Sequence, residues 1–160
     1  MRFSSLFAVL ALTATVAAAP HNAKPPAHHA QSVSHLVTIR MDTDFRPHKR
    51  SEFGRLLGYD PAEAHVHMGD KIQFVNPDDE NHAATGMSYT GQQVPKNYKF
   101  QGDFTQQRGR IIDASEWSTG TVRAHGGKSQ VFVTKRTGHY FYACGYHQAQ
   151  GMVGVIVVEP

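Results

Sequence analysis

The end of the chain carries three side chains that commonly bind metals, and they lie close together in the sequence. Cys144, His147 and Met152 supply a thiolate, an imidazole and a thioether from one short segment. Cys144 is the only cysteine, and with 11 His and 5 Met in 160 residues the chance of both neighbours at these offsets is roughly two in a thousand. Soft sulfur ligands combined with imidazole select copper over hard cations. The segment therefore predicts three of the four ligands of a mononuclear copper site.

The fourth ligand must come from elsewhere in the chain. His82 is the best candidate, because it follows the strand-like segment 71–75 and lies 62 residues before the cysteine. Two histidines and one cysteine in a plane, with a weak axial methionine, form the blue-copper electron-transfer site. Met87 is an alternative soft ligand, but Met152 fits the spacing of the loop better.

These residues resemble the pattern of the cupredoxins, the family of plastocyanin, pseudoazurin and azurin. That pattern is one histidine after a central strand and a Cys-x2-His-x4-Met loop before the last strand, and the resemblance covers about residues 34–160. It implies one Cu(I)/Cu(II) ion that changes oxidation state with little movement of its ligands. The implied ligands are His82, Cys144, His147 and Met152.

The chain differs from the family beside two of these ligands. Ala83 follows His82, where the family usually has an asparagine that ties the two ligand loops together, and Asn81 precedes it. Tyr146 stands before His147, where plastocyanins commonly have a proline. These differences leave the ligands in place and concern the rigidity and the redox potential of the site.

The resemblance also implies how electrons reach the copper. In this family the histidine of the ligand loop reaches the surface, so we expect redox partner proteins to dock transiently near His147. The apolar patch expected around it consists of Tyr146, Ala149, Gly151 and either Ala83 or Met87. The net charge of +3 is too small to indicate a nucleic-acid partner. We expect a monomer.

The N-terminal part of the chain has a different composition. Residues 1–19 combine a basic start, an apolar stretch and small residues, which predicts a cleaved signal peptide and a periplasmic or secreted protein. The apolar stretch is shorter than the roughly 20 residues that span a bilayer. Residues 20–33 hold three prolines and predict a flexible leader, in which His21, His28 and His29 could bind copper or zinc loosely.

Residues 34–160 contain short apolar segments separated by turn signals. We expect strands at 35–41, 64–68, 71–76, 129–134, 138–144 and 153–159. Because most of these segments have no helical pattern between them, they predict one all-β domain, an antiparallel Greek-key β-sandwich. Loops gather at the ends of such a sandwich, so ligands from two loops can meet there.

Three regions between the strands have no clear pattern. Residues 42–63 look irregular, with at most one short helical turn near 52–57, and their basic cluster is interpreted as a solvated surface. Residues 78–80, beside His82, are carboxylates interpreted as turn residues. In the long segment 86–120, the apolar side chains are expected to fix the chain to the sandwich. They are Phe100, Phe104, Ile111, Ile112 and Trp117.

Two other functions compete with electron transfer. A copper carrier or scavenger would use the same ligands and deliver the metal itself. An enzyme is disfavoured, because Ala143 and Gly145 flank the cysteine, where multicopper oxidases have histidines that lead to a second copper cluster. His65 and His67 lie on one face of a predicted strand, but surface histidines are the plainer interpretation.

Overall fold

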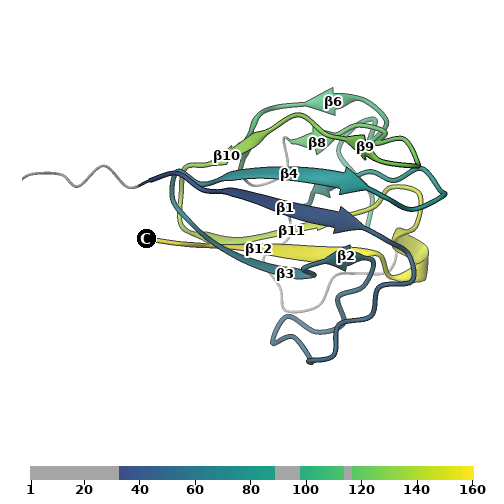
Figure 1. Cartoon of the computed structure of the whole chain (residues 1–160), viewed down its shortest axis with the longest axis horizontal. Coiled ribbons are helices and arrows are strands. Elements are labelled where there is room, and N and C mark those ends of the chain that lie inside the picture. Colours follow the sequence, from purple (N-terminus) through teal and green to yellow (C-terminus); the bar gives the residue numbers. More distant parts are fainter. Residues whose placement is uncertain (1–32, 89–97, 114–116) are drawn as a thin grey trace, which may run out of the picture. The chain divides into compact units, whose positions relative to one another are not determined.

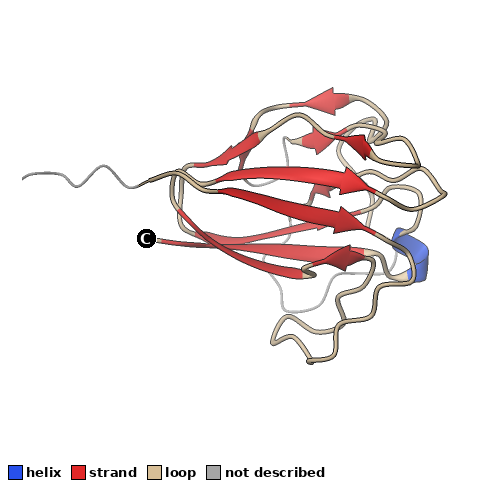
Figure 2. Ribbon diagram, viewed as in Figure 1, coloured by secondary structure: helices blue, strands red, loops and turns tan. Residues whose placement is uncertain are grey.

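The structure is a computed structural model, and it describes residues 33–88, 98–113 and 117–160. The expected signal peptide, 1–19, and all but the last residue of the expected leader, 20–33, lie outside the described residues. Residues 32–160 form one unit. Strands make up nearly all of its regular structure, and the one helix among the described residues is the short 3-10 helix η1 (Gln148–Gln150) (Figure 2).

The strands form two sheets (Figure 1). The first sheet contains β1 (Leu36–Met41), β2 (Tyr59–Asp60), β4 (Lys71–Asn76), β7 (Ile111–Ile112), β9 (Gly127–Lys128) and β10 (Phe132–Thr134). Its order is β2-β1-β4-β10-β7, with β9 also pairing with β4. The second sheet contains β3 (Glu63–His67), β5 (Thr85–Gly86), β6 (Gln107–Arg108), β8 (Ser118–Thr119), β11 (Gly138–Ala143) and β12 (Val153–Glu159). Its order is β3-β12-β11-β5-β8-β6.

The predicted all-β Greek-key β-sandwich is confirmed, but its strands are not all antiparallel. β1 pairs with β4 in parallel, and β3 pairs with β12 in parallel. The reason is the path of the chain: after β1 it forms β2 in the same sheet, crosses to the second sheet as β3 and returns beside β1 as β4, so β1 and β4 run the same way. The sequence pattern gives burial and not strand direction, so it could not distinguish these pairings.

The inner core lies between the two sheets, and aromatic rings fill its centre. Side chains alternate along β1 and β4, so that Ile39, Ile72 and Phe74 point inward and are fully buried. Phe74 stacks on Trp117 with ring centroids 6.0 Å apart. Because Trp117 and Ile112 belong to this core, the expectation that apolar side chains fix the segment 86–120 to the sandwich is confirmed for these two residues.

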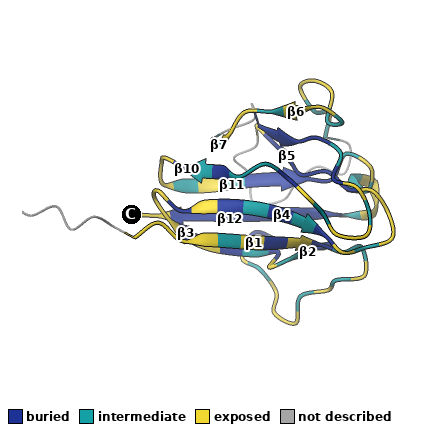
Figure 3. Cartoon of the chain, turned by 45° about the horizontal axis from the view of Figure 1, so that its top comes forward, coloured by how far each residue is buried: buried dark blue, intermediate teal, exposed yellow. Residues whose placement is uncertain are grey.

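A second group of apolar residues, the outer cluster, covers the other face of the second sheet. It contains Phe53, Leu56, Ala62, Met87, Phe141, Ala143, Val153, Val155 and Val157. β12 is therefore buried on both faces, with Ile156 and Val158 in the inner core and the alternate valines in the outer cluster (Figure 3). The segment 42–63, expected to be irregular, includes β2 and the first residue of β3, and it supplies Phe53 and Leu56 to this cover. The short helical turn expected near 52–57 is not formed, since the segment there makes a turn closed by a bridge between Ser51 and Gly54.

Candidate metal centre

The loop that follows β11 closes on itself through backbone hydrogen bonds. The N–H of Cys144 donates to Met152 O at 3.1 Å, so the two ends of the loop lie side by side. The N–H groups of His147 and Met152 donate to Cys144 O and His147 O at 3.2 and 3.1 Å. Gly151 ends the 3-10 helix with φ of 98°, a left-handed conformation that favours glycine. The loop is therefore closed by its own backbone hydrogen bonds.

His82 lies at the end of an ordered turn after β4. Asn76, at the end of that strand, donates its side-chain amide to Glu80 O at 2.8 Å and to Val122 O at 2.9 Å. His82 and Val122 exchange backbone hydrogen bonds in both directions, and His82 is fully buried. β4 and β11 both run toward the end of the sandwich that carries η1, so the two loops meet there (Figure 1).

The structure brings His82, Cys144 and His147 together. Their nearest ligand atoms all lie within 4.8 Å of one another. Cys144 Sγ lies 3.8 Å from His82 Nδ1 and 3.6 Å from His147 Nδ1, and the two Nδ1 atoms are 3.1 Å apart. Cys144 is fully buried, and the side chain of His147 is 18% exposed.

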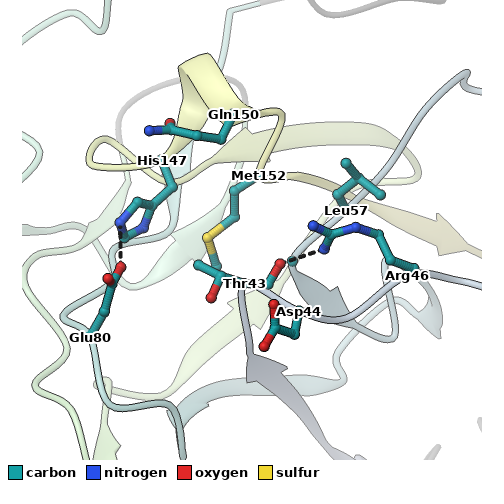
Figure 4. Close-up of a pocket in the computed structure, with 9 residues that line it drawn as sticks. Thr43, Asp44, Arg46, Leu57, Glu80, His147, Gln150 and Met152 are labelled. Atoms are coloured by element: carbon teal, nitrogen blue, oxygen red, sulfur yellow. Dashed lines mark hydrogen bonds and ion pairs between the residues drawn. The ribbon is translucent and has the colours of Figure 1, made fainter.

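Met152, the fourth residue singled out in the sequence, lies in the inner core with Cys144. It lines a cavity of about 400 Å³ together with His147 and Thr43 (Figure 4). Met87, the alternative sulfur ligand, lies instead in the outer cluster, on the opposite face of the second sheet. The burial pattern thus places Met152, and not Met87, on the same side of the sheet as the cysteine.

A carboxylate pairs with the outer nitrogen of each imidazole. Asp78 Oδ2 lies 3.0 Å from His82 Nε2, and Glu80 Oε2 lies 2.9 Å from His147 Nε2. A neutral imidazole that donates from Nε2 has an unprotonated Nδ1, so both Nδ1 lone pairs face the sulfur and each other. Such an arrangement needs a cation or a proton between its donors. Two imidazoles and a thiolate are the donors that copper prefers, so the residues fit this metal.

Electrostatics shift His82 toward the form that binds a metal and Cys144 away from it. Burial lowers the pKa of His82, although Asp78 opposes this effect, and a neutral imidazole is the form that binds metals. Burial raises the pKa of the Cys144 thiol, while N–H groups of Ala83 and of the ligand loop oppose the rise. Ala83 N lies 3.4 Å from the sulfur. Metal binding at neutral pH would therefore release the proton of the thiol.

The two carboxylates are the site residues that sequence reasoning missed. Residues 78–80 follow a proline, and this pattern by itself indicates only turn residues. The position of Asp78, four residues before His82, was the one available signal for its role, and no local signal links Glu80 to His147. Asn81, which precedes His82, accepts a hydrogen bond from Ala124 N on its side-chain oxygen at 3.1 Å.

The surface around His147 matches the expected apolar patch only in part: Tyr146 and Ala149 are exposed and Gly151 is half-buried. Ala83 and Met87 are buried at 0% and 2% exposure, so neither contributes to the surface. Tyr146 is 39% exposed, and its ring lies edge-to-face on Phe104 at 4.9 Å. The remaining histidines of interest lie elsewhere: His65 and His67 are exposed on β3, and the leader histidines are outside the described residues.

Comparison with known families identifies the fold. Residues 48–159 match the model of the copper-binding proteins of the plastocyanin/azurin family. The chain is a member of the cupredoxin family. Among solved structures, a purple cupredoxin from Nitrosopumilus maritimus is 16% identical with a TM-score of 0.45, over 76% of this chain and 98% of that one. A pseudoazurin from Methylobacterium extorquens AM1 is 21% identical with a TM-score of 0.42, over 77% and 74%.

Two further comparisons complete the description of this cupredoxin. An amicyanin variant is 15% identical with a TM-score of 0.45, over 81% of this chain and 88% of that one. No curated protein sequence matches the chain at a significant level. In the described part of the chain, no helix is both long and apolar enough to cross a membrane.

Proposed function

We propose that this cupredoxin is an exported type 1 copper protein that carries single electrons between redox partner proteins. The proposed ligands are His82, Cys144, His147 and Met152. The observation that carries the proposal is the convergence of two imidazole Nδ1 atoms and one sulfur, all within 4.8 Å, in a chain of the copper-binding family. Met152 is proposed as the axial ligand from the loop spacing and from its place in the inner core beside the cysteine.

A bound copper ion would supply a one-electron Cu(I)/Cu(II) couple. The protein supplies a frame that holds the ligands in place. His82 and Cys144 are fully buried and exclude water, and backbone hydrogen bonds close the ligand loop at both ends. Ligands held this firmly move little when the charge of the site changes, which favours fast electron transfer.

We further propose that partner proteins dock transiently where the ring of His147 reaches the surface. Of the three convergent residues, His147 alone is not fully buried, with 18% of its side chain exposed, so it offers the shortest path for an electron through the protein surface. Tyr146 and Phe104 supply apolar surface on one side of it. Small contacts of this kind are typical of brief electron-transfer encounters.

The proposals on location and reaction class rest on the sequence. Residues 1–19 have the composition of a signal peptide, which supports a periplasmic or secreted protein. We propose that the chain has no enzymatic activity, because Ala143 and Gly145 beside the cysteine offer no ligand for a second metal.

The proposed function is tested by adding Cu(II) to the mature protein and recording its visible spectrum. We expect an intense sulfur-to-copper charge-transfer band in the parent protein and none in Cys144→Ser. His67→Ala, which removes an exposed imidazole on β3 outside the proposed ligand set, is a control and should keep the full band. A parent protein without the band would contradict the proposal.

A second measurement separates electron transfer from copper delivery. An electron carrier keeps its copper through repeated reduction and oxidation. A copper carrier or scavenger, the alternative that the histidines of the leader favour, gives Cu(I) up to a competing chelator. Retention of copper in the reduced state against a micromolar-affinity chelator would support the electron carrier, and its loss would support the alternative.

A further inference from the structure

Glu80 occupies a position on the metal centre that its sequence neighbourhood does not explain. Its side chain is 59% exposed, yet one carboxylate oxygen lies 2.9 Å from Nε2 of His147, which belongs to a different loop (Figure 4). This nitrogen is on the outer edge of the ring, where a partner protein would meet the proposed electron carrier. The edge therefore carries a negative charge.

The backbone of the turn after β4 aims this carboxylate. Asn76 Nδ2 donates to Glu80 O at 2.8 Å, and Asp78 N donates to Asn76 Oδ1 at 3.1 Å, so Asn76 ties the turn at Asp78 and at Glu80 itself. The same turn directs Asp78 toward His82. One turn thus holds the outer nitrogens of both imidazoles with carboxylates.

We propose that Glu80 is a positioning residue for the copper site, acting through His147. Its carboxylate accepts the Nε2–H of His147, which keeps Nδ1 unprotonated and turned toward Cys144 Sγ, 3.6 Å away. Its charge stabilises the more positive oxidation state of a metal held by this ring and lowers the reduction potential. The inference rests on the proposed function, because it requires copper at the site.

Two variants separate the charge of Glu80 from its hydrogen bond. Glu80→Gln keeps an oxygen acceptor of similar size and loses the charge, whereas Glu80→Ala loses both. Asp44→Asn is the matched control, since Asp44 is an exposed carboxylate on the wall of the same cavity whose contacts in the described structure do not include either histidine (Figure 4). Because both carboxylates are exposed, all three variants are expected to fold.

The first readout is the reduction potential of the copper-loaded proteins. Glu80→Gln should change the relative affinity for Cu(II) and Cu(I) threefold to tenfold, which raises the potential by about 30–60 mV, since a tenfold change is about 59 mV for one electron. Asp44→Asn should change the affinity ratio less than twofold. Equal shifts in the two variants would overturn the proposal.

The second readout is the ring N–H of His147 in the diamagnetic Cu(I) protein, observed by NMR. In the parent protein and in Glu80→Gln this proton is held by an acceptor, so its exchange with water should be at least tenfold slower than in Glu80→Ala. Equal exchange rates in a copper-loaded parent and in Glu80→Ala would overturn the role of Glu80 alone. A parent protein that gives no charge-transfer band would instead overturn the proposed function, and this inference with it.

Discussion

Asp78 is expected to stabilise the fold as well as the site, and its loss should be measurable without copper. Its Oδ2 atom accepts hydrogen bonds from Thr43 N and Thr43 Oγ1, both at 2.9 Å, and lies 3.0 Å from His82 Nε2. The side chain is 13% exposed, so water replaces these partners poorly. At a net value of about 1 kcal/mol for each bond, Asp78→Ala should lower the free energy of unfolding by about 3 kcal/mol.

The same carboxylate predicts a dependence of stability on pH. Burial would raise the pKa of Asp78, but hydrogen bonds from Thr43 and His82 outweigh it and hold this pKa well below its usual range. A folded pKa below the unfolded value of about 3.9 gives stability that is complete above that pH and is lost as the pH falls through the folded pKa. Between pH 7 and pH 3 the loss is about 1 kcal/mol, because the unfolded carboxyl is then largely protonated.

The assay is urea unfolding of the apo-protein, followed by the fluorescence of Trp117, the only tryptophan and a fully buried one. The difference in unfolding free energy between the parent protein and Asp78→Asn should shrink by about 1 kcal/mol from pH 7 to pH 3. Asp79→Asn, an exposed neighbour, is the control and should change stability by less than about 0.5 kcal/mol. The reasoning is refuted if Asp78→Ala costs less than about 1 kcal/mol, or if the parent–Asp78→Asn difference is the same at both pH values.

Two further substitutions test other parts of the structure. Gly58→Ala should displace Met152 and change the visible spectrum of the copper protein, because an added Cβ would lie 2.5 Å from Met152 Cγ. Because Gly58 also has φ of +77°, the substitution should lower the free energy of unfolding by about 1–3 kcal/mol. His65→Gln tests a pH effect of opposite sign. Hydrogen bonding to Glu159 and then to Glu63 raises the pKa of His65. The charged imidazole therefore stabilises the fold below about pH 6.5, and this stabilisation is lost as the pH rises through the folded pKa. Since the side chain of His65 is exposed, solvent weakens these interactions. Urea unfolding should therefore show that the parent protein loses only about 0.5 kcal/mol of unfolding free energy relative to His65→Gln between pH 6 and pH 9.

Each substitution has an outcome that contradicts its premise. Gly69→Ala carries a similar strain, with φ of +93°, but meets no atom within 4 Å, so it should destabilise the protein and leave the copper spectrum unchanged. Identical spectra for Gly58→Ala and the parent protein would mean that Met152 is not held by this contact. A parallel pH dependence of the parent protein and His65→Gln would mean that the carboxylates beside His65 do not stabilise its charged form.

The long strands were predictable because their burial follows from local alternation. The expected strand at 71–76 coincides with β4, and those at 138–144 and 153–159 lie within one residue of β11 and β12. The two-residue strands β6, β7 and β8 were not predictable, because their pairing depends on neighbours far along the chain and two residues carry no period. The packing of residues 42–58 on β12 was not predictable for the same reason. It depends on the outer face of the second sheet, which the local sequence does not reveal.

The sequence by itself determined the family and the donor residues to consider. Cys144, His147 and Met152 have fixed offsets within one short loop, so they stay near one another however the rest of the chain folds. Only the tertiary structure decided that Nδ1 of His82 faces that loop, and that the carboxylate of Glu80 pairs with Nε2 of His147. Contacts between loops depend on how two sheets are packed and how each turn is tied. Those long-range hydrogen bonds leave no periodic or local trace in the order of the residues.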